Sequence, residues 1–129
     1  ILSPRAGNSP MQATLYHNPR CGTSRKVLDI LKDEITDLTI IDYLKTPPDL
    51  ATLRDLASLL PSGAHSLLRT KEPLATELKL TEKGTTDEQI LIAISAHPIL
   101  LNRPVVVTTL GARVCRPAEI VREILPPTA

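Results

Sequence analysis

The stretch QATLYHNPRCGTSRKVLDIL, residues 12–31, decides the fold of this chain. Its first part, Gln12 to Tyr16, alternates apolar and polar residues and predicts a strand, and the loop from His17 to Gly22 predicts a turn. From Thr23 or Ser24 to about Lys32, apolar residues recur at the spacing of a helix with one buried face. The stretch therefore predicts a strand, a turn and a helix, with Cys21 just before the helix.

The rest of the chain extends this unit into an α/β domain. The expected elements are a strand over Leu38–Leu44, a helix from Pro47–Asp49 to Leu60, short helices over His65–Arg69 and Glu72–Leu78, a helix from Thr85 or Thr86 to before Pro98, strands over Val105–Thr108 and Arg113–Cys115, and a helix over Pro117–Leu125. Their order is βαβ, a helical insertion, then ββα.

Length and composition favour one globular domain. The chain has 129 residues, of which 42% are hydrophobic and 22% charged. It has two Tyr, no Phe and no Trp, so the core must be built from aliphatic side chains. The lack of aromatic residues also argues against a surface that stacks nucleic-acid bases. A net charge of +1 gives no overall field for nucleic acid or a membrane.

The sequence shows no segment for export or for a membrane. Its longest apolar run, Ile90–Leu101, falls short of the roughly 18 residues that a membrane span needs. Residues 1–10 do not resemble a secretory signal, and we expect them to be a tag remnant or an upstream extension. Residues 11–129 are then a single domain. We expect a cytoplasmic monomer with reduced thiols.

Cys21 is the residue with the most distinctive surroundings. At the start of a helix, unpaired N–H groups and the helix dipole lower the pKa of a thiol and favour the nucleophilic thiolate. His17, Arg20 and Arg25 can add positive charge or a hydrogen-bond donor, and Ser24 can offer its hydroxyl to the sulfur. The alternative interpretation is a buried structural cysteine.

Several kinds of cysteine chemistry are excluded by spacing. A tyrosine-phosphatase loop needs an arginine six residues after the cysteine, where this chain has Val27. A dithiol redox site needs a second cysteine where this chain has Ser24. A metal site lacks ligands around Cys21, so we expect no metal. Cys21 is thus a one-thiol site, whose intermediates must be resolved by another molecule or by Cys115.

Three separated motifs together resemble the glutaredoxin-coupled arsenate reductases. They are YHNPRCGTSR at residues 16–25, HPILLNRP at residues 97–104 and LGARVCRP at residues 110–117. The resemblance extends from about Met11 to Leu125. It implies a thioredoxin-like fold with a helical insertion, in agreement with the order of elements given above.

The resemblance also implies a reaction, the reduction of arsenate to arsenite, with glutathione as co-substrate, glutaredoxin as partner and no bound cofactor. The site residues that it implies are Cys21 as nucleophile, His17 and Ser24 as the residues that lower its pKa, and Arg69, Arg103 and Arg116 as the oxyanion-binding arginines. Such a set is physically reasonable, because an arsenate dianion beside a thiolate needs several cations, and guanidinium groups match tetrahedral oxyanions.

Other interpretations of these residues stay open at this point. Arg69 can be a solvated helix charge. Arg103 precedes Pro104, a proline that is typically cis and faces the catalytic loop in thioredoxin-like folds. Arg113 points away from Arg116 if the strand continues to that residue. Cys115 is expected to be a packing thiol, unless it lies close enough to Cys21 to form a disulfide.

Two other functions compete with arsenate reduction. Redox-responsive regulators that bind RNA polymerase share the fold, but usually depart from the arginine set or carry two cysteines at Cys-x-x-Cys spacing. A related thiol reductase of unknown substrate is the second competitor. The presence of Arg69, Arg103 and Arg116 together with Ser24 favours the enzyme.

Overall fold

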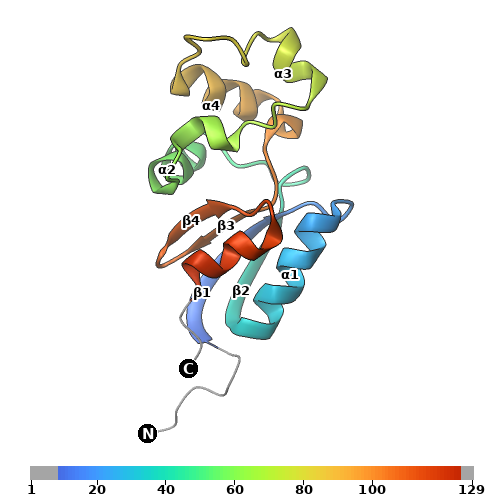
Figure 1. Cartoon of the computed structure of the whole chain (residues 1–129), viewed down its shortest axis with the longest axis vertical. Coiled ribbons are helices and arrows are strands. Elements are labelled where there is room, and N and C mark those ends of the chain that lie inside the picture. The colour runs from blue at the N-terminus through green and yellow to red at the C-terminus, as the bar shows by residue number, and fades with distance from the viewer. Residues whose placement is uncertain (1–8, 126–129) are drawn as a thin grey trace, which may run out of the picture. The chain divides into compact units, whose positions relative to one another are not determined.

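The structure is a computed structural model that describes residues 9–125 and falls into two compact units (Figure 1). The first unit joins the N-terminal part of the chain, up to Asp42, to the part from Arg103 onward, and the second spans Tyr43–Asn102. Residues 1–8 lie outside the described residues. The expected tag remnant or extension over residues 1–10 therefore lies outside the described residues except for Ser9 and Pro10, where strand β1 begins.

The first unit contains a four-stranded sheet in the order β2-β1-β3-β4. Strand β1 (Ser9–His17) pairs in parallel with β2 (Ile35–Asp42) and antiparallel with β3 (Val105–Thr108). Strand β4 (Gly111–Val114) pairs antiparallel with β3. This arrangement confirms the expected thioredoxin-like βαβ–ββα core.

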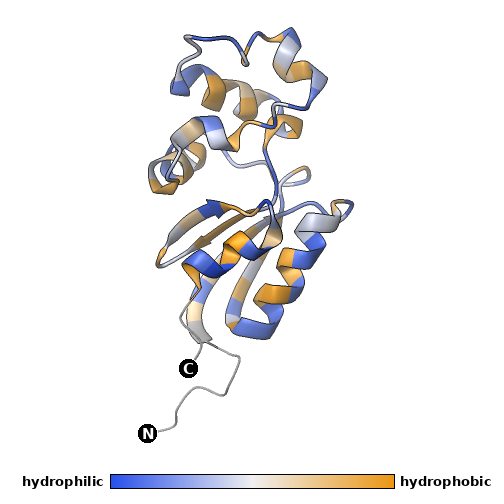
Figure 2. Cartoon of the chain, in the orientation of Figure 1, coloured by the Kyte–Doolittle hydropathy of each residue, from blue (hydrophilic) through white to orange (hydrophobic). Residues whose placement is uncertain are grey.

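Two helices complete the first unit. Helix α1 (Gly22–Glu34) contacts β1 and β2, and the 3-10 helix η3 (Ala118–Ile124) contacts β3, β4 and α1 (Figure 1). Figure 2 shows hydrophobic and hydrophilic segments alternating along α1, as expected for a helix with one buried face. The buried core of this unit is aliphatic, as the composition requires, and consists of Ala13, Leu15, Val27, Leu31, Ile35, Val106, Cys115, Ala118, Val121, Ile124 and Leu125.

Strand β2 differs from its expected position. It begins at Ile35, directly after α1, and ends at Asp42, whereas the sequence predicts Leu38–Leu44. The first residues of β2 include the exposed Thr36 and Asp37. Polar side chains are tolerated there because β2 is an edge strand of the sheet that residues 9–125 form, with β1 as its neighbour. The apolar content of this strand was therefore a poor guide to where it starts.

The second unit is the expected helical insertion. It contains α2 (Leu50–Leu59), the 3-10 helix η1 (Gly63–Leu67), α3 (Pro73–Glu77), α4 (Asp87–Ala96) and the 3-10 turn η2 (Pro98–Leu100). His97 ends α4, as expected, and its N–H donates to the Ala93 carbonyl. No helix within residues 9–125 is long and apolar enough to cross a membrane.

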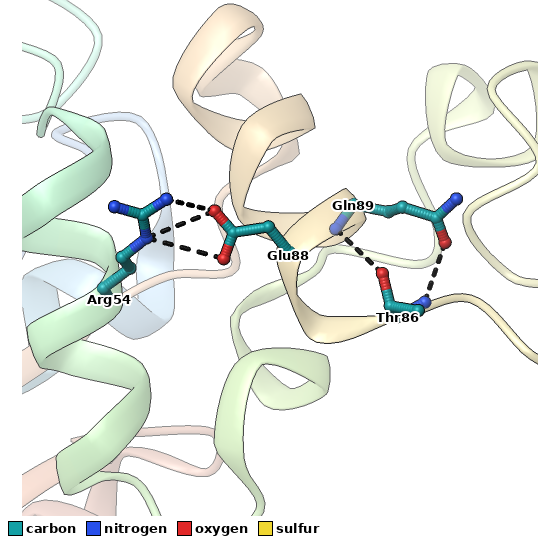
Figure 3. Close-up of polar contacts among 4 residues, drawn as sticks. All are labelled: Arg54, Thr86, Glu88 and Gln89. Atoms are coloured by element: carbon teal, nitrogen blue, oxygen red, sulfur yellow. Dashed lines mark hydrogen bonds and ion pairs between the residues drawn. The ribbon is translucent and has the colours of Figure 1, made fainter.

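The N-terminus of α4 has a capping box (Figure 3). The Thr86 hydroxyl accepts a hydrogen bond from the Gln89 N–H at 3.2 Å, and the Gln89 side-chain oxygen accepts one from the Thr86 N–H at 2.8 Å. One residue away, Glu88 forms an ion pair with Arg54 of α2 (Figure 3). The first turn of α4 is thus fixed both by its own residues and by the neighbouring helix.

We expect Thr86→Ala to lower the free energy of unfolding by about 1 kcal/mol, because it leaves the Gln89 N–H of the first turn without its acceptor. Urea denaturation followed by circular dichroism measures this loss. The matched control is Thr81→Ala, at an exposed threonine of the same unit, which should change stability by less than about 0.5 kcal/mol. Equal losses in the two variants would contradict the capping role of Thr86.

Candidate active site

Cys21 lies in the turn between β1 and α1, immediately before the first residue of the helix. Its N–H donates to the Asn18 carbonyl at 3.0 Å, and its own carbonyl accepts the Arg25 N–H at 3.0 Å. The Arg25 side chain returns to the turn and donates to the Pro19 carbonyl at 2.9 Å. The backbone around Cys21 is therefore held from both sides, and its partly buried thiol has a defined position.

The sheet topology brings Arg103 and Arg116 to the same end of the first unit as Cys21. Cys21 follows the carboxyl end of β1, Arg103 precedes β3, and Arg116 follows β4. Because β3 is antiparallel to both of its neighbours, these three chain positions meet at one edge of the sheet. The peptide bond before Pro104 is cis, as expected, and so is the bond before Pro117.

Arg116 contacts the thiol directly. Its Nη1 atom lies 3.7 Å from Cys21 Sγ and also donates to the Arg103 carbonyl at 2.9 Å. The second bond fixes the guanidinium group relative to the residue that precedes β3. Arg113, three residues earlier, forms an ion pair with Glu123 at 3.0 Å. The two arginines therefore have different partners, although β4 ends at Val114 and the expected strand alternation does not extend to Arg116.

The surroundings of Cys21 favour the thiolate. Burial raises the pKa of the thiol, but hydrogen bonds from the Ser24 N–H, the Arg103 and Arg116 side chains and the Thr23 N–H lower it by more. The net effect is a pKa below the ordinary value for cysteine. Two of the four donors are N–H groups of the first turn of α1, so the helix N-terminus acts on the sulfur as its sequence position predicts.

Ser24 links the turn to His17. It is fully buried, and its hydroxyl lies 2.6 Å from His17 Nδ1 and accepts the Asn18 N–H at 3.1 Å. The sequence suggests that this hydroxyl is offered to the sulfur. In the structure the hydroxyl bonds to His17 and Asn18, and it is the Ser24 backbone N–H that lowers the pKa of Cys21.

His17 has an imidazole whose protonation is disfavoured by its surroundings. Burial lowers the pKa of its imidazole; Asp42 opposes this effect, while Arg25 and Lys32 add to it. The net pKa lies below the ordinary value, so the ring is mostly neutral near pH 7. Of the two roles that the sequence allows for His17, a positive charge or a hydrogen-bond donor, a neutral ring supplies only the second. His17 is linked to the site by the hydrogen bond between its Nδ1 atom and the Ser24 hydroxyl.

Arg69 belongs to the second unit, and its part in the site stays a prediction. It lies two residues after the end of η1, and its N–H donates to the Leu100 carbonyl at 2.8 Å. Its Nε lies 3.7 Å from a Glu72 carboxylate oxygen, and its side chain is only 23% exposed. A largely covered side chain outside a helix does not match the alternative of a solvated helix charge.

Cys115 is a packing thiol, as expected. It is fully buried in the aliphatic core of the first unit, and burial raises its pKa to about 12. Thiolate chemistry needs an accessible sulfur and a pKa near ambient pH, and Cys115 has neither. The two cysteines of the chain thus have opposite environments.

We expect iodoacetamide at pH 7 to label Cys21 of the native protein at least about a hundredfold faster than Cys115, because alkylation requires an exposed thiolate. Peptide mass spectrometry measures the two rates separately. Unfolding in guanidinium chloride should make both cysteines react at similar rates. Comparable labelling of the two residues in the native protein would contradict the assigned environments.

The sequence alone did not single out Asn18 or Asp42. Asn18 accepts the Arg20 N–H on its side chain at 3.0 Å, and its own N–H bonds to Ser24. An asparagine before a proline is a common turn residue, so this signal was present in the sequence. Asp42 is brought opposite His17 by the register of β1 with β2, which no local pattern reports.

Comparisons with known proteins agree over most of the chain. A model of the ArsC family matches residues 16–124. The arsenate reductase of Escherichia coli K12 is 47% identical over 113 residues, which cover 88% of this chain and 80% of that protein. The uncharacterised protein YfgD of the same strain is 43% identical over 115 residues, covering 88% of this chain and 97% of YfgD. A solved structure of an arsenate reductase from Vibrio cholerae has a TM-score of 0.82 at 37% identity and covers 91% of this chain and 100% of that one.

Proposed function

Because this chain belongs to the ArsC family, we propose that it reduces arsenate to arsenite through a covalent bond between arsenic and the sulfur of Cys21. The observation that carries the proposal is the contact of Arg116 Nη1 with Cys21 Sγ at 3.7 Å, together with the lowered pKa of that thiol. A thiolate held between guanidinium groups is suited to attack an anion.

Charge explains why two arginines are needed at the thiol. An arsenate dianion and a thiolate repel each other, and the repulsion is strong where burial lowers the local dielectric. Arg103 and Arg116 both lower the pKa of Cys21, so their charges reach the sulfur. Guanidinium groups also offer paired N–H donors that fit the oxygens of a tetrahedral oxyanion. We propose Arg69 as a third ligand of arsenate, as the resemblance to the arsenate reductases implies.

The proposed reaction has four steps, the last of which is a hydrolysis. The Cys21 sulfur attacks arsenic, an As–O bond breaks, and the oxygen leaves as water after protonation. The thiol of glutathione then displaces a second oxygen as water and bonds to arsenic. Finally a glutaredoxin thiolate attacks the glutathione sulfur: a mixed disulfide forms, the electron pair of the As–S bond stays on arsenic, and arsenic(V) becomes arsenic(III). Hydrolysis of the remaining As–S bond regenerates Cys21 and releases arsenite.

In this scheme His17 and Ser24 belong to the catalytic set through their effect on Cys21, and no bound cofactor or metal takes part. Glutathione and glutaredoxin are the proposed electron donors. Both are compatible with the cytoplasm, where thiols are kept reduced, and with a monomer whose thiol is open to a partner. Cys21 is only partly buried, which supports access of a partner to its thiol.

A coupled assay tests the proposal. Wild-type protein is incubated with arsenate, glutathione, glutaredoxin, glutathione reductase and NADPH, and NADPH absorbance is followed. We expect consumption that depends on arsenate and falls to the background rate when glutathione or glutaredoxin is omitted. Turnover with glutathione alone would contradict the proposed role of glutaredoxin, and no turnover with the complete mixture would contradict the function.

One observation favours a second candidate, a thiol reductase of another substrate. The chain covers 97% of YfgD, an uncharacterised protein, at 43% identity. The same assay with other oxyanions in place of arsenate separates the two functions. Consumption of NADPH with a different oxyanion, and none with arsenate, would favour the second candidate, because the thiol chemistry would remain while the substrate changed.

A further inference from the structure

Asp42 lies opposite His17 in the sheet of the first unit. The two residues are partners in the parallel register of β1 with β2, and each is the last residue of its strand. Residues paired across neighbouring strands project from the same face of the sheet. Their side chains therefore share one face, at the carboxyl end of both strands, next to the turn that contains Cys21.

This face is the one that packs against α1. Leu15, two residues before His17, belongs to the core together with Val27 and Leu31 of α1. Ser24, in the first turn of α1, is buried on the same side and bonds to His17 Nδ1. Asp42 and His17 thus share the face on which His17 bonds to Ser24, and the Ser24 N–H acts on the thiol.

Three charged groups act on the buried His17 ring. The Asp42 carboxylate of β2 raises the pKa of the imidazole, whereas Arg25 and Lys32 of α1 lower it, in the same direction as burial. Of these three groups, Asp42 alone favours the protonated ring. Its removal would leave burial and two cations acting together against protonation.

We propose that Asp42 is a positioning residue that acts on Cys21 through His17 and Ser24. As a role in catalysis this rests on the proposed function, although the coupling itself can be measured without arsenate. A protonated His17 donates from Nδ1 to the Ser24 oxygen and leaves the serine proton free for another acceptor, such as the thiolate. A neutral ring with an unprotonated Nδ1 instead accepts that proton. Asp42 shifts the balance toward the first arrangement.

The test measures two titrations in wild type and Asp42→Asn without any substrate. The pKa of His17 is followed by NMR of the imidazole C–H signals, and that of Cys21 by the pH dependence of its alkylation with iodoacetamide. In Asp42→Asn we expect the His17 pKa to fall by about half a unit or more, because the carboxylate no longer favours the cation. We expect the alkylation midpoint of Cys21 to move upward in the same variant.

Two matched variants separate this coupling from a general disturbance of the structure. Asp42→Glu keeps the charge and should retain both titrations near their wild-type values. Asp37→Asn removes a carboxylate from the same strand but from the opposite face, where Asp37 pairs with Gln12, and should leave both titrations unchanged. If Asp42→Asn titrates like wild type at both groups, or if Asp37→Asn has the same effect, the proposal is overturned.

A measurement on the wild type covers the case in which Asp42→Asn does not fold. The carboxyl carbon of Asp42 is titrated by NMR, and the His17 signals are followed through the same acidic range. We expect His17 to show a second inflection at the titration midpoint of Asp42, and its absence would overturn the proposal. A normal coupling with no arsenate-dependent NADPH consumption would instead count against the proposed function alone.

Discussion

Cys21→Ser is expected to lower arsenate-dependent NADPH consumption at least about a thousandfold, to the background rate of the coupled assay. A serine hydroxyl stays protonated near neutral pH and bonds weakly to arsenic, so the first step of the reaction is lost. The donors that lower the pKa of Cys21 cannot compensate, because an alcohol ionises far above the pH of the assay.

The matched control is Cys115→Ser, which makes the same chemical change in the core of the first unit. We expect this variant to retain turnover, and to unfold more easily by about 1–3 kcal/mol because a hydroxyl replaces a buried thiol. Full activity of Cys21→Ser would refute the proposed nucleophile. Loss of activity in a folded Cys115→Ser protein would require an intramolecular step between the two cysteines.

Arg116→Ala is expected to lower kcat/KM for arsenate about a hundredfold, since it removes a charged donor from both the thiolate and the bound oxyanion. The variant also loses one of the groups that lower the pKa of Cys21, so the pKa rises. The activity that depends on the thiolate should therefore appear at higher pH than in wild type. Steady-state kinetics across a pH series measures both effects.

Arg113→Ala serves as the control for this variant. Arg113 is three residues from Arg116 but pairs with Glu123, so its removal should leave the pH profile and kcat/KM near wild type. Arg116→Lys keeps the positive charge without the fork of N–H donors, and we expect an intermediate rate. Equal losses in Arg113→Ala and Arg116→Ala would show that the effect reflects general surface charge and not the contact with Cys21.

Most of the fold could be predicted from local patterns, because each pattern depends on the residue types within one short segment of the chain. The strand before Cys21 and the valine-rich strand at Val105–Thr108 both appear in the structure as expected. The start of β2 could not be predicted in this way. An edge strand can carry polar residues such as Thr36, so its hydrophobic pattern is weak.

The site could be predicted only in part. Helix position and flanking residues singled out Cys21, and antiparallel pairing explains why Arg103 and Arg116 meet it. The protonation state of His17 could not be predicted, because it depends on burial and on charges from two other elements. Asp42 was missed for the same reason, since strand register is a property of the folded sheet.

The central claim is that arsenic changes oxidation state at this protein, and direct arsenic speciation tests it. Wild-type protein is incubated with arsenate, glutathione, glutaredoxin, glutathione reductase and NADPH, and arsenate and arsenite are separated by chromatography and quantified. We predict that one arsenite forms for each NADPH consumed, and that none forms above background with Cys21→Ser. Arsenic that remains entirely as arsenate in the presence of folded wild-type protein with a reactive Cys21 would contradict the account.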